Sequence, residues 1–377
     1  DGLWGLGRGR EGARGVDWPL TLPQIDYTGV DGSRAAPDGL KLGVQRGDIS
    51  PLYRLRAIED LKVGKSPAWL RWRLQAVGQR AISNLVDVTN YIMFELGQPL
   101  HSFDLHKVAG GKVGVALAKE GEKLVTLDGQ ERILTGRDIT IRDAEKAIGL
   151  GGVMGGLNSE IDDASSAVML EGAVFNMSNI RHTSKRLNLP SEAAYRFERG
   201  VNQGMTAYAL ERAAVMIAKL GQGRVSSGVL GSELKPWSSP YINLRRKRAE
   251  SLVGVPMAAE FCTDALEKLG CTVTPEFSSE GDETWNVTPP SNRLDLEREA
   301  DLIEELARVY GYERMPETLP LVEQTMESSG RRLPRHKFFA RVKRWAAGLG
   351  LNEAINYSYV GHKDLDFLGL PAEGRIS

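Results

Sequence analysis

Apolar and polar side chains alternate along residues 53–58, and this pattern predicts a strand with one buried face. Ser66 and Pro67 then form a helix-start signal, an N-cap residue followed by proline at the first helical position. Apolar residues continue at helical spacing as far as Gly78, a residue typical of helix C-termini. A second helix is predicted over residues 86–96, and a glycine follows it.

The next part of the chain favours strands. Asp128-Gly129 lies between two short segments that alternate in polarity, which predicts a tight hairpin. Further elements are expected as strands at residues 113–118, 139–141, 147–153 and 168–170 and as helices at 179–187 and 205–220. Helices and strands in this order indicate an α+β domain with a mixed sheet over residues 49–225.

Two further units follow a linker that is rich in proline and serine. The second unit covers residues 241–316, with helices predicted at 258–269 and 297–310 and short strands at 272–273 and 285–287. A third begins near residue 330, with a predicted helix at 335–349 and strand at 354–360. Residues 1–48 are rich in Gly, Arg and Pro, and we interpret them as an incomplete N-terminal region.

Composition limits the classes of protein that remain. The 377 residues carry a formal net charge of −1, so the chain as a whole is not a polybasic nucleic-acid coat. No apolar run reaches the roughly 18 residues of a membrane span. Cys262 and Cys271 are too few for a disulfide framework, and a reducing, cytoplasmic setting is expected.

Residues 84–104 interleave hydrogen-bonding side chains with bulky apolar ones. A turn at residues 97–99 brings His101 back toward Thr89 and Asn90 on the preceding helix. From the residues alone this is a capped helix, a turn and a histidine with satisfied hydrogen bonds. A binding pocket is the alternative.

A second candidate site lies in the charged helix near residue 300. Asp301, Glu304 and Glu305 are spaced for one helix face, and Asp295 precedes that helix. Crowded carboxylates need compensating cations, and Mg²⁺ prefers such oxygen ligands. The alternative is a solvated acidic face that pairs with arginines, for which the candidates are Arg293, Arg298 and Arg308.

Four strings in the first domain occur together in the order of a known family. They are Asp87-Val-Thr-Asn-Tyr91 with Glu95-Leu-Gly-Gln-Pro-Leu-His101, Gly149-Leu-Gly-Gly-Val-Met-Gly-Gly156, Leu170-Glu-Gly-Ala173, and Ser191-Glu-Ala-Ala-Tyr-Arg-Phe-Glu-Arg-Gly200. This domain resembles the editing domain of bacterial-type phenylalanyl-tRNA synthetase beta subunits. Asp1-Gly-Leu-Trp-Gly5 weakly resembles the end of that family's N-terminal region.

The resemblance extends past the first domain. Arg293-Leu-Asp295, Asp301-Leu-Ile-Glu-Glu305 and Val309-Tyr-Gly-Tyr312 are similar to the family's next domain. The resemblance implies a small helical, winged-helix-like domain over residues 241–316, with magnesium bound at Asp295, Asp301, Glu304 and Glu305. Residues 352–360 resemble the start of the family's inactive, catalytic-like domain, an antiparallel-sheet class II synthetase fold expected over 330–377.

The resemblance also implies roles for residues of the first domain. Glu171 matches a buried glutamate that accepts a hydrogen bond from the hydroxyl of a mischarged tyrosine. Gly155 and Ala193 match small residues that leave room for its ring. The other matched pocket residues are Thr89, Asn90, His101 and Ser191. Hydrolysis would use a positioned water, and we expect no covalent nucleophile.

As a beta subunit, the chain would act with an alpha subunit in an α2β2 enzyme that attaches phenylalanine to its tRNA with ATP. The resemblance implies that ATP binds the alpha subunit. Residues 149–156 lack the Lys-Ser/Thr of a phosphate loop, so no cofactor-binding residues are expected in this chain. Two alternatives are a free-standing editing hydrolase that acts in trans and a non-enzymatic RNA-binding module. The lack of a large positive charge argues against the second.

Overall fold

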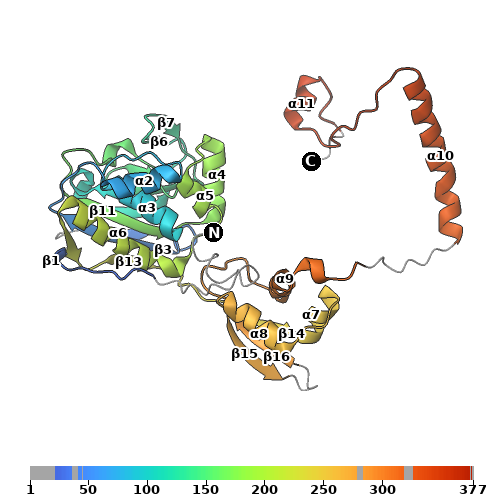
Figure 1. The fold of residues 1–377 in the computed structure, drawn as a ribbon. Coiled ribbons are helices and arrows are strands. Elements are labelled where there is room, and N and C mark those ends of the chain that lie inside the picture. Colours follow the sequence, from blue (N-terminus) through green and yellow to red (C-terminus); the bar gives the residue numbers. More distant parts are fainter. Residues whose placement is uncertain are drawn as a thin grey trace. The chain divides into compact units, whose positions relative to one another are not determined.

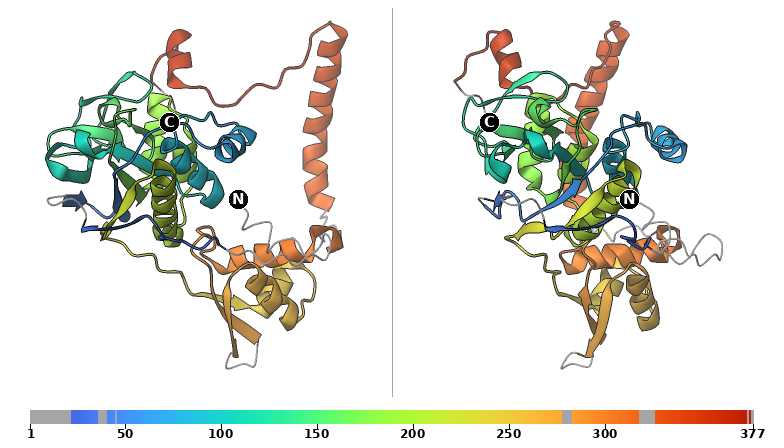
Figure 2. Two further views of the ribbon diagram at one scale, coloured as in Figure 1. Left: turned by 60° about the vertical axis from the view of Figure 1, so that its left-hand side comes forward. Right: turned by 90° about the vertical axis from the view of Figure 1, so that its left-hand side faces the viewer.

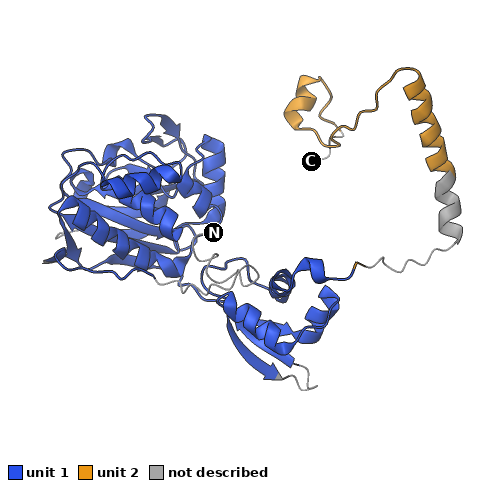
Figure 3. Cartoon of the chain, viewed as in Figure 1, with its two compact units in different colours: residues 1–316 blue, residues 317–377 orange. Residues whose placement is uncertain are grey.

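The computed structural model describes residues 22–35, 41–44, 46–277, 283–317, 326–373 and 375. The chain forms two compact units, Asp1–Pro316 and Glu317–Ser377 (Figure 3). The family-like string at residues 1–5 lies outside the described residues. The first unit is an α+β structure with several sheets, and the described part of the second contains two helices joined by an irregular segment.

The first sheet forms the centre of the first unit (Figure 1). Its strand order is β1 (Asp31–Ala35), β12 (Arg224–Ser227), β3 (Leu52–Glu59), β11 (Val168–Val174) and β4 (Leu100–Asp104), with β13 (Leu230–Glu233) also on β3. Only β1 and β12 pair in parallel among the described strands of this sheet. The strand predictions for residues 53–58 and 168–170 are confirmed by β3 and β11.

A second sheet lies against the first. Its order is β10 (Met154–Gly155), β9 (Ala147–Leu150), β8 (Ile139–Arg142), β5 (Lys112–Leu117) and β2 (Lys41–Val44). The predicted hairpin at Asp128-Gly129 is confirmed, since it joins β6 (Lys123–Val125) to β7 (Glu131–Ile133). Both β1 and β2 come from residues 1–48, where the sequence analysis predicts no strand.

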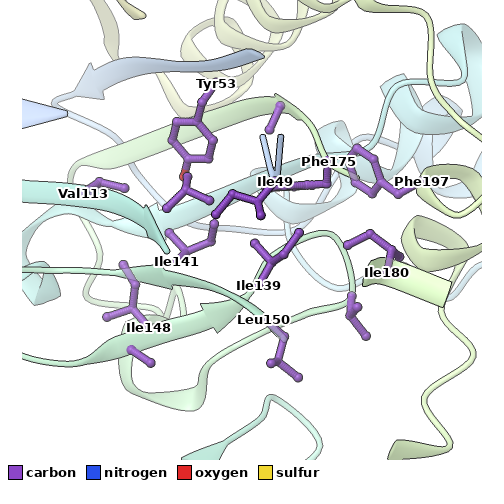
Figure 4. Close-up of a cluster of buried hydrophobic side chains, with 14 of the residues drawn as sticks. Ile49, Tyr53, Val113, Ile139, Ile141, Ile148, Leu150, Phe175, Ile180 and Phe197 are labelled. Atoms are coloured by element: carbon purple, nitrogen blue, oxygen red, sulfur yellow. The ribbon is translucent and has the colours of Figure 1, made fainter. Parts of the chain in front are cut away.

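The main hydrophobic core lies between these two sheets (Figure 4). Alternate residues of each strand enter it, among them Tyr53 and Leu55 from β3 and Ile139 and Ile141 from β8. Figure 4 places the ring of Tyr53 in this cluster. Helices α4 (Met177–Leu187) and α5 (Glu192–Phe197) contribute further apolar side chains to this core. Most side chains on the inner face of β3, β4 and β11 are therefore removed from water.

Three helices cover the opposite face of the first sheet. They are α2 (Ala68–Ala76), α3 (Val86–Leu96) and α6 (Thr206–Gly221). The helix prediction for residues 86–96 is confirmed, and Gly97 ends it in the left-handed conformation at φ +74°. Leu70 and Leu74 of α2 enter this second core, while the outer side of α2 faces solvent.

Residues 242–312 form a smaller α+β module within the first unit. Its antiparallel sheet has the order β14 (Ile242–Arg245), β16 (Glu283–Thr288) and β15 (Thr272–Phe277). The helices are α7 (Arg246–Val253), α8 (Ala259–Lys268) and α9 (Glu299–Tyr310). The core of this module includes both cysteines, which are free thiols.

The second unit contains α10 (Met326–Gly348) and α11 (His362–Phe367). The strand predicted at residues 354–360 is wrong, because this segment forms no strand hydrogen bonds and bends at Ser358. Tyr357 and Tyr359 are 96% and 93% exposed. An alternating pattern makes a strand only where a partner strand accepts its backbone hydrogen bonds, and the described residues of this unit supply none. None of the chain's described helices is both long and apolar enough to span a membrane.

Candidate functional site

Three segments converge at one edge of the core between the sheets. Strand β11 carries Glu171, and His101 lies directly opposite it on β4 in the antiparallel register. Neighbouring cross-strand side chains project from the same face of a sheet. Gly155 of β10 reaches this point from the second sheet. The structure thus brings together three of the seven residues predicted for the pocket.

Glu171 is a carboxylate in an apolar environment. Its side chain projects from the same face as the core residues Met169 and Ala173, and the residue is 6% exposed. The hydroxyl of Tyr53 donates a hydrogen bond to its Oε2 atom over 2.5 Å. Burial raises the pKa of Glu171 to about 7, and the hydrogen bond from Tyr53 opposes that rise. Near neutral pH the carboxyl therefore exists in both protonation states.

His101 is half-buried and its ring contacts Phe103 edge-on, with the centroids 4.5 Å apart. Removal from water lowers the pKa of His101 to about 4. The imidazole is consequently neutral at pH 7, with one nitrogen able to donate and the other able to accept a hydrogen bond.

Gly155 faces the imidazole of His101 at very short range. A Cβ atom at position 155 would lie 2.5 Å from Cε1 and 2.7 Å from Nε2 of His101, and 3.1 Å from Cδ1 of Leu127. Atoms do not approach so closely without displacement, so any side chain here must push the imidazole aside. Gly155 is required by the close approach of two sheets.

Ser191 and Ala193 lie at the start of α5, beside the segment that precedes β10. The Oγ atom of Ser191 accepts a hydrogen bond from the backbone of Ala194 and donates one to the carbonyl of Val153 over 2.7 Å. Ser191 is therefore an N-cap that fixes α5 to the segment that precedes Gly155. Ala193 is half-buried against the main core. The hydroxyl of Ser191 is already engaged in positioning the backbone.

Thr89 and Asn90 lie on α3, which contacts β4. The hydroxyl of Thr89 donates to the carbonyl of Val86 in the same helix, and Thr89 is buried. Asn90 is half-buried. Asp87, which precedes them on α3, has a structural role, since it accepts hydrogen bonds from Ser66 and from the backbone of Ile82.

The four acidic residues of the small module are not arranged as a metal site. Arg293 binds Asp295 through two nitrogens, at 2.9 and 2.6 Å, and also reaches Glu305 at 3.1 Å. Arg308 donates to Glu305 over 2.6 Å. The described residues contain no group of three metal-ligating side chains placed around one point.

Asp301 and Glu304 complete this picture. Asp301 accepts hydrogen bonds from the backbone at the start of α9 and pairs with Arg298 at 3.3 Å. Glu304 is exposed while Glu305 is buried, so they do not share one face. The carboxylates do not fit a magnesium ion as they stand. The arginine-paired alternative matches the structure, and magnesium remains a prediction.

Burial and ion pairing act in opposite directions on Glu305. Burial raises its pKa, but hydrogen bonds from Arg308 and Arg293 outweigh burial and hold the pKa below its ordinary value. The carboxyl of Asp295 has a lowered pKa because Arg293 donates to it. Both groups are thus ionised at neutral pH and neutralised by arginines.

Two open hollows lie elsewhere in the first unit, each about 400 Å³ in volume. One is formed by α8 with β15 and β16, and the other lies beside β6 and β9. None of the seven predicted pocket residues lines either hollow.

Tyr53 is the residue that sequence analysis misses. The alternation along residues 53–58 correctly places it on the buried face of β3. A buried tyrosine hydroxyl needs a hydrogen-bond partner, so this position already indicated a polar group inside the core. Which group it is depends on the pairing of Tyr53 with Ala173, two residues after Glu171.

Two family models match the chain. The first, described as B3/4 domain, matches residues 49–222. The second, described as tRNA synthetase B5 domain, matches residues 242–312.

The curated relatives are named phenylalanine–tRNA ligase beta subunit. The protein from Nitratidesulfovibrio vulgaris is 50% identical over 373 residues, which are 98% of this chain and 46% of that protein. The protein from Oleidesulfovibrio alaskensis is 50% identical over 372 residues, which are 99% of this chain and 46% of the relative. The chain therefore spans about half the length of these relatives.

A solved structure also shows similarity. It is an N-terminal fragment of the phenylalanyl-tRNA synthetase beta subunit from Pyrococcus horikoshii, 13% identical, with a TM-score of 0.35. The similarity covers 77% of this chain and 78% of that fragment.

Proposed function

The chain belongs to the family of phenylalanine–tRNA ligase beta subunits, and we propose that residues 49–225 hydrolyse tRNA that carries tyrosine in place of phenylalanine. The observation that carries this proposal is the buried carboxylate of Glu171. Tyr53 is its one hydrogen-bond donor among the described residues, and Tyr53 binds Oε2. The other oxygen is left to accept a hydrogen bond from a ligand.

A phenol is a suitable donor for that oxygen. Apolar pockets reject an added hydroxyl only weakly, so separating tyrosine from phenylalanine needs a group that binds the hydroxyl directly. A phenylalanine ring would leave the second oxygen of the buried carboxylate without a donor, at a cost of about 1–3 kcal/mol. The contact between Tyr53 and Glu171 supports this, because a tyrosine of the chain already uses the same carboxylate.

The neighbouring residues supply space and orientation. Gly155 keeps the second sheet clear of the imidazole of His101. A neutral His101 can hold a water molecule by accepting a hydrogen bond from it or by donating one to its oxygen. The family resemblance also suggests Thr89, Asn90, Ser191 and Ala193 as pocket residues, with Ser191 acting through the position of α5 and Thr89 and Asn90 carried by α3 beside β4. The proposal includes no covalent intermediate.

The remaining assignments concern the whole ligase. We propose that it acts in the cytoplasm with an alpha subunit, as an α2β2 assembly that binds tRNA, with ATP and Mg²⁺ used in the synthetic reaction. Residues 241–316 would form a winged-helix-like domain and residues 330–377 the start of a catalytic-like domain. The family membership supports these assignments. No step is attributed to a metal in this chain.

The test is hydrolysis of tyrosyl and phenylalanyl esters of the tRNA with the phenylalanine anticodon. The enzyme is the beta chain assembled with its alpha subunit, in wild-type form and as Glu171→Ala. We expect the wild type to hydrolyse the tyrosyl ester preferentially and the variant to lose the preference. Glu305→Ala is a matched control, because Glu305 is a similarly buried carboxylate in the small module. An unchanged preference in Glu171→Ala would overturn the proposal.

A further inference from the structure

A basic and aromatic surface lies on the outer side of α2, on the covering layer of the first sheet. It consists of Lys65, Trp69, Arg71, Trp72, Arg73 and Arg80, and we call it the α2 surface. All six residues are exposed. Both panels of Figure 2 show α2, in blue, at the periphery of its domain.

The charge of this segment differs from that of the chain. Residues 61–86 contain five basic residues, Lys62, Lys65, Arg71, Arg73 and Arg80, and no acidic residue. The whole chain, in contrast, has a net charge of −1. A local concentration of positive charge attracts a polyanion even where the net charge is near zero.

Trp72 is the most exposed part of this surface. Leu70 and Leu74 anchor α2 in the core, and Trp72 lies on the opposite side of the helix. It is 70% exposed, and within the described part of the chain no ring or cation stacks on it. A large aromatic face in water beside cations is suited to stacking with a base.

Trp69 and Arg73 are held in place by α3. The guanidinium of Arg73 lies 5.5 Å from the ring centroid of Trp69 and 5.9 Å from that of Tyr91, and it donates to the hydroxyl of Tyr91 over 2.8 Å. Trp69 and Tyr91 make an edge-on contact. These contacts reduce the entropy that Arg73 would lose on binding a phosphate.

The acidic group that contacts Tyr91 does not cancel the charge. Glu95 accepts a hydrogen bond from Tyr91, but its carboxylate is paired with Arg212 at 2.5 and 2.7 Å. The α2 surface therefore remains positive. It also adjoins α3 at Tyr91, next to the proposed pocket residue Asn90.

We propose that the α2 surface binds single-stranded RNA, with a base stacked on Trp72 and phosphates bound by Arg71 and Arg73. A single strand exposes base faces that a duplex keeps stacked. Binding is separate from hydrolysis, so this proposal holds or fails independently of the proposed function.

The test is a fluorescence-anisotropy titration of the 377-residue chain with a labelled, unstructured RNA of about 12 nucleotides. Trp72→Ala is expected to weaken binding about fivefold or more, because one stacked base is lost. Arg71→Ala should reduce the slope of log K against log salt by about 0.7, the value for one phosphate contact on a single strand. A duplex of the same length should compete poorly.

Two variants serve as controls. Tyr241→Ala removes an aromatic side chain that is 84% exposed, and Arg224→Ala removes an exposed arginine, both outside the α2 surface. Each should bind the RNA as the wild type does. The proposal is overturned if Trp72→Ala, with a wild-type circular dichroism spectrum, binds as tightly as the wild type. Binding of the duplex equally well would also overturn it.

Discussion

The hydroxyl of Tyr53 donates a hydrogen bond to Glu171 inside the core between two sheets, over 2.5 Å. Both side chains are removed from water, and the pKa of Tyr53 is raised above its ordinary range by burial and by the Glu171 carboxylate. The pair is therefore a neutral phenol beside a carboxyl that titrates near pH 7.

Removing the phenol donor should raise the pKa of Glu171. The hydrogen bond from Tyr53 favours the ionised carboxylate, so Tyr53→Phe leaves burial unopposed and moves the pKa above about 7. An NMR titration of carboxyl-labelled glutamate would measure this change. Tyr27→Phe is the control, because Tyr27 donates to a different carboxylate, Glu211. A pKa for Glu171 that stays the same in Tyr53→Phe would contradict the assigned role of Tyr53.

The raised pKa of Glu171 predicts how local stability depends on pH. Between pH 4.5 and 7 the folded chain retains a proton at Glu171 that the unfolded chain has released. Glu171 therefore contributes stability that is fully present below pH 4.5 and is lost as the pH rises through 7. The total change in the free energy of unfolding is roughly 3 kcal/mol.

Hydrogen exchange of the β11 amides measures that dependence. Relative to Glu171→Gln, wild-type protection should fall as the pH rises across this window. The glutamine is isosteric and does not titrate, so other groups cancel in the comparison. A constant difference between the two proteins from pH 4.5 to 7 would contradict the raised pKa.

His101 should contribute in the opposite direction. Burial lowers the pKa of His101 from 6.5 to about 4. Between pH 4 and 6.5 the unfolded chain therefore binds a proton at this residue and the folded chain does not. Stability from neutral His101 is present above pH 6.5 and is lost as the pH falls through 4. An NMR titration of the imidazole should therefore show no protonation at pH 6. Half-protonation near pH 6.5 would place His101 in water and outside the core.

Gly155→Ala should displace the imidazole of His101. The new methyl group would lie 2.5 Å from Cε1, so the two sheets must separate or the ring must rotate. We expect a loss of about 1–3 kcal/mol in unfolding free energy, as for other overpacked cores, together with loss of tyrosyl-ester hydrolysis. Urea denaturation measures the first effect. Gly64→Ala is the control, because a Cβ at residue 64 meets no atom within 4 Å.

Arg293 should stabilise the small module more than Arg298 does. Arg293→Met leaves Asp295 without its partner and removes one of two arginines from the buried Glu305. A loss of about 1–3 kcal/mol is expected for an uncompensated buried carboxylate. The side chain of Arg298 is 79% exposed, so Arg298→Met removes an ion pair worth at most about 1 kcal/mol. Equal effects of the two substitutions in thermal unfolding would contradict this arrangement.

Local sequence patterns predict much of the fold. Helix α3, the hairpin at Asp128-Gly129 and the buried face of β3 each follow from short-range chemistry, namely apolar spacing, a glycine stop and a turn dipeptide. Strands β1 and β2 do not, because each has five residues or fewer and is stabilised by partners more than 60 residues away in the chain. Residues 354–360 show the reverse case, a strand pattern without a partner strand.

The sequence likewise predicts some residues of the candidate site but not their tertiary contacts. Glu171, His101 and Gly155 follow from the family resemblance, and the strand register brings them together. The role of Ser191 as an N-cap and the bond from Tyr53 to Glu171 depend on tertiary contacts. Helical spacing alone grouped Asp301, Glu304 and Glu305, but Glu305 is buried against Arg293 and Arg308, Asp301 pairs with Arg298, and Glu304 is exposed.

The most direct test of the account combines one substitution with one substrate change. Hydrolysis rates of the tyrosyl and phenylalanyl esters are measured for the assembled wild-type enzyme and for Glu171→Ala, and the four rates give a coupling free energy between Glu171 and the substrate hydroxyl. A direct hydrogen bond predicts a coupling of about 1–3 kcal/mol in favour of the tyrosyl ester. A coupling of zero, with both esters affected equally, would contradict the claim that Glu171 recognises the hydroxyl.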